Sequence, residues 1–280
     1  MRSLNALSFR DVFRRGSRTY FHSSLFFPRS VRRDVFVLYA FVRTADDFVD
    51  RIPQDAAGFA AFRKDYEDAA SGAAPSSPII AGFLDLKTRM RFEAAWIERF
   101  LGAMASDLSQ RMYETLEETM EYMVGSAEAI GLMMARIMGL PDASLPQAAL
   151  LGRAMQYINF IRDIAEDAEL GRQYLPASEA RRFGLDRWGR EAAERSPAEF
   201  SSFIRAQIRL YEEWQTEAEK GYRSIPKRFR IPVSAAGDMY KWTAAQIRKD
   251  PLVVFRKKVK PSKARIYGAV ARRALSCPRT

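Results

Sequence analysis

Two short acidic runs stand out in this sequence because each repeats a carboxylate at a spacing of four residues. The first run contains Asp46 and Asp50, and the second contains Asp163 and Asp167. On an α-helix, residues four apart lie on one face, so each run would present two carboxylates together. Like charges at this spacing repel one another, and Mg²⁺ prefers carboxylate and phosphate oxygens as ligands. The pattern therefore predicts two acidic helices that face each other and clamp a diphosphate through divalent cations.

Basic and amide side chains accompany both runs. Arg43 lies three residues before the first aspartate of the first run, and Arg162 directly precedes the second run. Guanidinium groups form paired hydrogen bonds with phosphate oxygens, so we expect both arginines to stabilise the negative charge of a diphosphate as it leaves. Gln156 and Asn159 lie on an otherwise apolar stretch, where polar amides need a partner. The alternative is that each run is a hydrated helix face balanced by its neighbouring arginine.

The acidic runs need helices to hold them, and the apolar pattern predicts helices along the whole chain. Apolar residues recur at spacings of three and four, with few alternating runs that could form strands. The most regular stretches are 31–48, 112–138 and 150–164. Clusters of helix-breaking residues fall at 71–78, 139–146, 171–176 and 225–232. We predict an all-α protein in which residues 1–280 form a single domain, because no low-complexity linker divides the chain.

Composition narrows the partners and the metal chemistry. A formal net charge of +11 favours an acidic partner, which could be nucleic acid, an anionic membrane surface or a phosphorylated small molecule. Arginine and lysine are spread along the chain without a nucleic-acid-binding motif, which argues against nucleic acid. Cys277 and His22 are the only residues of their types, so a Cys-rich or His-rich metal site is excluded and a Ser/His triad is disfavoured. Any metal must bind to carboxylates.

The sequence also predicts a cytoplasmic protein, because a single cysteine suits a reducing compartment. No stretch approaches the roughly 20 apolar residues that a membrane-spanning helix needs. The basic residues 1–15 fit a solvated N-terminal helix better than a transit peptide, and they lack the apolar core of a signal peptide. We expect a protein that is soluble or attached peripherally to a membrane. The sequence does not specify its oligomeric state.

The second acidic run lies in the most specific signature of the chain. From Gln156 to Asp167 the sequence reads QYINFIRDIAED, and GRQYLP follows at 171–176. This string is similar, almost position for position, to the second aspartate-rich motif of the squalene and phytoene synthase family. The first run, from Asp46 to Asp50, resembles the first aspartate-rich motif of that family.

Other segments extend this resemblance from about residue 17 to about residue 265. A segment that contacts a diphosphate in the family is matched by Ser17, Arg18, Thr19 and Tyr20. The stretch 122–133 resembles the helix that lines the prenyl tunnel, although Glu128 stands where a small residue is commoner. Tyr240 resembles a pocket tyrosine, and residues 251–259 resemble a basic segment that closes the site.

The resemblance implies an isoprenoid synthase helical bundle around a central cavity, with Mg²⁺ or Mn²⁺ at its mouth. It also implies a prenyltransferase that joins two prenyl diphosphates head to head through a cyclopropyl diphosphate. The residues implied to be catalytic are Asp46, Asp50, Asp163, Asp167, Arg43, Arg162 and Tyr240. The residues implied to bind substrate are Ser17, Arg18, Thr19, Tyr20, Tyr39, Tyr122, Gln156, Asn159 and Arg172. The implied metal ligands are Asp46, Asp50, Asn159, Asp163 and Asp167.

A carbocation formed from an allylic diphosphate must be kept from water, so the site needs an apolar or aromatic lining. The aromatic candidates are Phe26, Phe27, Tyr39, Tyr122, Tyr157, Phe160 and Tyr240. Proton loss ends phytoene or dehydrosqualene synthesis, whereas squalene synthesis ends with hydride transfer from NADPH. The chain shows no Gly-rich dinucleotide motif after a strand and no C-terminal membrane anchor, and its 125–134 string resembles bacterial phytoene synthases.

The expected product is therefore phytoene, made from two geranylgeranyl diphosphates without NADPH for carotenoid biosynthesis. One alternative is a squalene or dehydrosqualene synthase that uses farnesyl diphosphate. A second alternative, from another functional class, is a non-catalytic, membrane-associated assembly factor that keeps the fold. A third alternative is a basic peripheral membrane or nucleic-acid binder that uses 256–272 as its patch, in which the acidic helices are incidental. In an enzyme the same patch would hold the protein near membranes.

Overall fold

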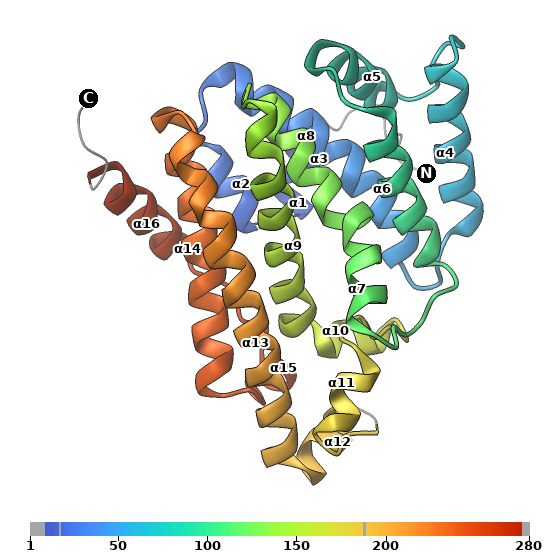
Figure 1. Ribbon diagram of the computed structural model, residues 1–280. Helices are drawn as coiled ribbons and strands as arrows, with labels where there is room; N and C mark the ends of the chain where they lie inside the picture. The colour runs from blue at the N-terminus through green and yellow to red at the C-terminus, as the bar shows by residue number, and fades with distance from the viewer. Residues whose placement is uncertain (1–8, 17, 187–188, 276–280) are drawn as a thin grey trace.

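The computed structural model describes residues 9–16, 18–186 and 189–275, and nearly all of its regular structure is helical (Figure 1). In chain order the α-helices are α1 Phe9–Gly16, α2 Arg18–Ser24, α3 Arg29–Asp50, α4 Ala56–Ala70, α5 Pro78–Met90, α6 Ala94–Ser106, α7 Leu116–Met123, α8 Ala129–Ile137, α9 Leu145–Arg162, α10 Ile164–Glu169, α11 Ala177–Arg182, α12 Arg190–Arg195, α13 Pro197–Glu219, α14 Lys227–Lys249, α15 Val253–Arg256 and α16 Lys263–Leu275. Within these ranges no strand occurs beyond one isolated bridge between Met112 and Gln173, so the all-α prediction is confirmed.

Three of the four predicted breaks fall between helices, and the fourth is only partly right. The stretches 71–78, 139–146 and 171–176 contain the connections from α4 to α5, α8 to α9 and α10 to α11. The predicted break at 225–232 ends at Pro226, because α14 begins at Lys227 and continues through Pro232. Pro232 is buried in the wall of the cavity described below, so tertiary packing keeps the helix intact where local propensity would end it.

Side-chain caps begin three of the described helices, namely α4, α5 and α7. The Asp55 carboxylate accepts a hydrogen bond from the Gly58 backbone at 2.8 Å, which satisfies a free N–H at the start of α4. The Ser77 hydroxyl caps α5 in the same way, and Thr115 caps α7. These helix starts follow from ordinary cap residues at turns, which is why their positions are readable from the sequence.

A central helix, α9, organises the bundle. It packs against α8 on one side and against α13 and α14 on the other, and it is seen near the middle of Figure 1. A cavity of about 750 Å³ is lined by residues of α3, α8, α9 and α14, with Leu38, Ile130, Leu151 and Val233 among its apolar residues. This volume lies in the range typical of small-molecule sites. In the described ranges, no helix is long and apolar enough to cross a membrane.

Glycines let the helices on one side of the cavity approach closely. Between α7 and α8 the chain forms a π-helical turn, Val124–Glu128, whose backbone lies against α6 and α9. A Cβ on Gly125 would lie 2.2 Å from the Arg99 carbonyl oxygen, and one on Gly152 would lie 2.4 Å from the Ala127 carbonyl oxygen. Only glycine fits at these backbone contacts, so the width of the cavity depends on them.

The Gly125→Ala substitution should destabilise the protein by about 3 kcal/mol, because the added methyl group collides with backbone that cannot rotate away. Its matched control is Gly102→Ala on α6, where a Cβ meets nothing within 4 Å. That control should be neutral or stabilising by up to about 1 kcal/mol, since alanine favours helix. Urea unfolding of both variants tests the contrast, and equal stabilities would show that the close approach carries no energetic weight.

Candidate active site

The two acidic motifs meet at one end of the cavity. Asp46 and Asp50 lie in the last turns of α3, and Asp163 and Asp167 belong to the second motif; all four line the cavity. The helix is interrupted at Asp163, which separates α9 from α10, a break that the sequence pattern did not predict. The backbone N–H of Asp167 still donates to the Asp163 carbonyl at 2.8 Å, so the helical spacing of the two aspartates is kept.

Crowding of the carboxylates shifts their protonation. Burial, reinforced by the charge of Asp50, raises the pKa of Asp46 to about 8 even though Arg43 opposes the shift. Burial also raises the pKa of Asp167 well above its usual range, with Asp163 and Asp50 adding to the effect. Asp50 therefore acts on a carboxylate of each motif. Such a concentration of negative charge is a suitable setting for cations.

Asp163 behaves differently from the other acids because cations surround it. Burial alone would raise its pKa, but Arg162 and Lys258 outweigh this and hold the pKa below its usual range. Arg162 donates to both carboxylate oxygens of Asp163, at 2.8 and 2.5 Å, and the Lys258 ammonium lies 3.4 Å from one of them. Arg43 binds Asp46 at 2.7 Å and Asp47 at 2.5 Å in the first motif. Each motif thus carries an arginine beside its carboxylates, as predicted.

The raised pKa of Asp46 predicts a stability that falls with pH in the metal-free protein. The folded state holds a proton up to about pH 8, whereas an unfolded aspartate releases it near pH 4. The stability gained at low pH is therefore lost as pH rises through about 8. Asp163 is ionised in both states over the upper part of this window, so it adds no slope there. Thermal unfolding in a chelator should give a lower Tm at about pH 8 than at about pH 6, and Asp46→Asn should reduce this slope.

A buried ionic layer lies behind the motifs, and sequence reasoning missed part of it. Asp107 is only 2% exposed and accepts hydrogen bonds from the hydroxyl groups of Tyr122 and Tyr174, both at 2.8 Å. The Arg172 guanidinium donates to Asp50 at 2.8 Å and to the Tyr174 hydroxyl at 3.2 Å. Burial raises the pKa of Asp107 to about 6, although Arg172 and the two tyrosines oppose this. Asp107 follows α6 as an ordinary helix-end aspartate, so no local pattern marks it.

A glycine turn places Arg172 in this layer. Gly171 has a φ of +68°, a left-handed conformation that ends α10 and reverses the chain. The backbone N–H of Arg172 then donates to the Asp167 carbonyl at 2.8 Å, while its side chain reaches the end of α3. Arg172, predicted to bind substrate, lines the cavity, but its side chain is only 3% exposed and is engaged by Asp50.

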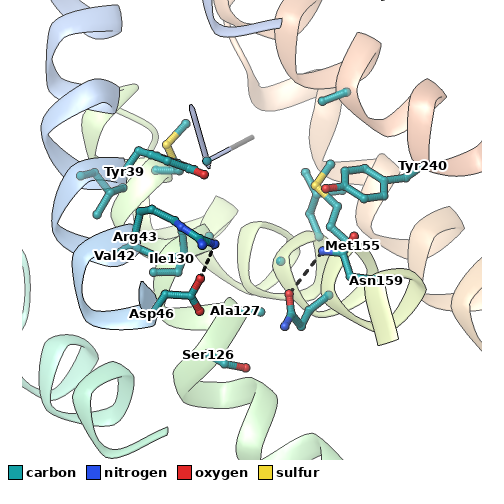
Figure 2. Close-up of a pocket in the computed structure, with 18 of the residues that line it drawn as sticks. Tyr39, Val42, Arg43, Asp46, Ser126, Ala127, Ile130, Met155, Asn159 and Tyr240 are labelled. Carbon is teal, nitrogen blue, oxygen red and sulfur yellow. Dashed lines mark hydrogen bonds and ion pairs between the residues drawn. The ribbon is translucent and has the colours of Figure 1, made fainter. Parts of the chain in front are cut away.

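The remaining predicted residues line the cavity from different helices. Figure 2 shows Tyr39, Arg43 and Asp46 on α3 facing Asn159 on α9 and Tyr240 on α14. Gln156 and Tyr122 line the same cavity. Burial raises the pKa of Tyr39 and of Tyr122, so both phenols are neutral hydrogen-bond donors at neutral pH. The structure thus brings together all the predicted site residues whose side chains it describes.

Two aromatic candidates do not line the cavity, whereas Phe27 and Phe160 do. Phe26 is 38% exposed on the outside of the protein, where its ring contacts Tyr267. Tyr157 is fully buried in the core and donates its hydroxyl to Gln207 at 2.5 Å. These two predictions are wrong, because apolar spacing identifies buried positions without distinguishing core from cavity.

The N-terminal segment and Glu128 are the remaining residues singled out by the resemblance. Ser17 and the side chains of Arg18, Thr19 and Tyr20 lie outside the described part of the chain, so their predicted roles stay predictions. Glu128 does not line the cavity. Instead its carboxylate accepts a hydrogen bond from Arg153 at 2.6 Å, behind the wall formed by the π-helical turn.

The donor set fits a hard divalent cation. The Oδ1 atom of Asn159 is buried without a hydrogen-bond donor and belongs to a residue lining the acidic end of the cavity. In the described ranges, no three acidic, histidine or cysteine side chains converge closely enough to hold a metal ion by themselves. Mg²⁺ often keeps waters and takes one or two carboxylates together with substrate phosphates, so this arrangement is compatible with it.

Comparisons with known proteins agree with this geometry. The squalene/phytoene synthase family profile matches residues 13–265. The 15-cis-phytoene synthase of a Paracoccus species is 30% identical, covering 92% of this chain and 87% of its own. The phytoene synthase of Rhodobacter capsulatus is 31% identical, covering 97% of this chain and 81% of its own.

Solved structures share the fold at lower identity. A dehydrosqualene synthase solved with a ligand superimposes with a TM-score of 0.85 at 23% identity, over 95% of this chain and 94% of its own. The squalene synthase HpnC from Alicyclobacillus acidocaldarius gives a TM-score of 0.76 at 24% identity, over 86% and 92% of the two chains. Because the family profile matches most of the chain and the similar proteins and structures are of the same kind, the protein belongs to the squalene/phytoene synthase family.

Proposed function

We propose that the protein condenses two geranylgeranyl diphosphates head to head into phytoene. The observation that carries this proposal is the convergence of the two acidic motifs at one end of an apolar cavity, in a chain of this family. The C20 substrate is supported by relatives of 30–31% identity that are named phytoene synthases. The dehydrosqualene and squalene synthase structures are more distant and support the fold alone.

Substrate anchoring is assigned to the acidic end of the cavity. Mg²⁺, or Mn²⁺ in its place, would be held by Asp46, Asp50, Asn159, Asp163 and Asp167. When bound, such a cation supplies Lewis-acid polarisation of the diphosphate oxygens. Arg43 and Arg162 would exchange their present carboxylate partners for oxygens of the departing diphosphate, since a guanidinium binds either group. The substrates would be positioned by Tyr39, Tyr122, Gln156 and Arg172, together with residues 17–20.

The proposed chemistry has two stages. First, the C–O bond of one substrate breaks, the double bond of the second attacks the freed allylic carbon, and loss of a proton closes a cyclopropane that keeps the second diphosphate. The second C–O bond then breaks, the resulting cyclopropylcarbinyl cation rearranges, and another proton is lost. Two C20 diphosphates thus give one C40 hydrocarbon, two diphosphates and two protons, so no NADPH is required.

The cavity lining supports carbocation chemistry. Apolar side chains from α3, α8 and α9 are among the residues that line it, and such a lining would keep water from the cation. Aromatic faces such as Phe160 stabilise nearby positive charge. The final proton would pass to Tyr240, which is buried in the wall, or to the released diphosphate. We also propose that the protein works at a membrane surface in the cytoplasm, because its product does not dissolve in water.

Incubation of the purified protein with radiolabelled geranylgeranyl or farnesyl diphosphate tests the proposal. Reactions with and without Mg²⁺ and NADPH are extracted and separated by chromatography. A C40 product that forms from the C20 substrate without NADPH is the expected result. A C30 product would instead identify squalene or dehydrosqualene synthesis. If folded protein makes neither, the enzymatic proposal fails and the assembly-factor alternative takes its place.

A further inference from the structure

We infer that the outward face of α16, with the adjoining pocket between α14 and α16, binds the anionic phospholipid surface of a membrane. This inference rests on the proposed function only in its rationale, since a water-insoluble product has to reach a bilayer. The surface itself is defined by the exposure, charge and packing of α16. It lies at the edge of the bundle beside α14 and α2 (Figure 1).

The outward face of α16 is unusually apolar. Ile266, Ala269 and Val270 are buried and form a small core with Met239 of α14. Successive helical residues are about 100° apart, so the residues opposite this buried side can be assigned. The centre of the outward face carries Ala264, Gly268, Ala271 and Leu275, all of them exposed. A helix on a protein surface usually presents charged residues on its outward face. In α16, by contrast, both the buried face and the centre of the outward face carry apolar residues.

Basic side chains border this apolar strip, and α16 contains no acidic residue. Arg265 and Arg272 lie seven residues apart, on the edge that faces α14. Arg273 is bound by the Asp238 carboxylate at 2.8 and 2.5 Å. By contrast, Arg265 and Arg272 form no ion pair with any carboxylate in the described part of the chain, so they are available to an external anion.

A pocket of about 360 Å³ lies at this edge of α16. Its lining includes Lys241, Trp242, Arg265, Arg272 and Arg273, with Asp238 as the one acidic residue. The Arg265 guanidinium stacks over the Trp242 ring at 4.7 Å, which fixes the guanidinium at the rim. Guanidinium forks match phosphate oxygens, and tryptophan favours the membrane interface. This chemistry suits the phosphate of a lipid head group.

The opposite edge of α16 connects the strip to the cavity wall. The Tyr267 hydroxyl hydrogen-bonds to the His22 ring nitrogen at 3.0 Å, and the Tyr267 ring contacts exposed Phe26 at 5.8 Å. His22 belongs to α2, whose Ser23 and Ser24 line the active-site cavity. The surface is therefore separated from the cavity by one helix, which would place the hydrocarbon product close to the bilayer.

Flotation of the full-length protein with lipid vesicles tests the inference. The vesicles contain phosphatidylcholine alone or phosphatidylcholine with phosphatidylglycerol, at low and high salt. The test variant is Arg265→Gln with Arg272→Gln. The matched control is Arg195→Gln with Lys249→Gln, which removes the same charge from exposed positions on α12 and α14. A third variant, Ala271→Glu, places a negative charge on the strip and keeps a good helix former.

We expect binding only to vesicles that contain phosphatidylglycerol, and weaker binding at high salt. The double arginine variant should bind about thirtyfold more weakly, since each basic residue near an anionic surface contributes about five- to sixfold. The control should lose less than about threefold. Ala271→Glu should also lose binding. Activity on detergent-dispersed geranylgeranyl diphosphate should be unchanged in all three variants, because none of these residues lines the active-site cavity.

Several results would overturn the inference. They are absence of vesicle binding by the unaltered protein, equal losses in the arginine and control variants, and light scattering that shows a dimer disrupted by Ala271→Glu. The last result would make α16 an interface between two copies of the chain. Loss of vesicle binding with intact activity leaves the proposed function standing, whereas vesicle binding without any prenyl condensation removes the proposed function and keeps the membrane surface.

Discussion

Asp167→Asn should lower the condensation rate at saturating Mg²⁺ by roughly a thousandfold while leaving the metal-free protein at least as stable as before. The rate falls because one of the carboxylates proposed to hold the cation and diphosphate is gone. Stability is kept because burial and neighbouring acids already favour the protonated form of Asp167, which asparagine resembles in shape and charge. Loss of activity with a constant or higher Tm is the opposite of what a purely structural aspartate would give.

The control for this variant is Glu169→Gln, which neutralises an exposed carboxylate two residues further along the chain, also in α10. It should retain most of the activity. The measurements are initial rates over a range of Mg²⁺ concentrations, together with thermal unfolding in a chelator and in excess Mg²⁺. Added Mg²⁺ should raise the Tm of the unaltered protein more than that of the Asp167 variant. Full activity in Asp167→Asn would remove this residue from the metal site.

Arg172→Met should destabilise the protein by about 3–5 kcal/mol, because it removes a buried cation that pairs with Asp50 and offsets the charge of Asp107. For a chain of this size the Tm should fall by roughly 10 °C. Activity should also be lost, since Asp50 would no longer be held at the end of α3. Arg172→Lys keeps the positive charge but lacks the planar guanidinium fork. Its stability should therefore lie between those of the unaltered protein and Arg172→Met.

Two further variants separate this effect from ordinary surface ion pairs. Arg182→Met removes an exposed arginine that pairs with Glu179, and it should change stability by less than about 0.5 kcal/mol. Adding Asp50→Asn to Arg172→Met should restore part of the stability, because one unpaired carboxylate is removed. Additive losses in the double variant would show that the two side chains do not act as a pair.

Local sequence patterns were sufficient for the helical class and for three of the four predicted breaks between helices. Apolar spacing identified 31–48 as a helix, and the structure has α3 at Arg29–Asp50. Turn residues located the connection after α4 in the same way. The interruption at Asp163 and the continuation of α14 through Pro232 were not predicted. Both depend on what the backbone packs against, which local propensity does not encode.

The amino-acid sequence by itself determined the chemistry of the site: two pairs of aspartates at helical spacing, each beside an arginine and together sufficient to suggest cation and diphosphate binding. That information is local, because a spacing of four residues sets a helix face without any tertiary contact. Only the tertiary structure decided that Asp50 acts on both motifs, that Asp107 and Arg172 lie behind them, and that Phe26 faces outward. These relationships join residues far apart in the chain, and burial is a property of the assembled helices.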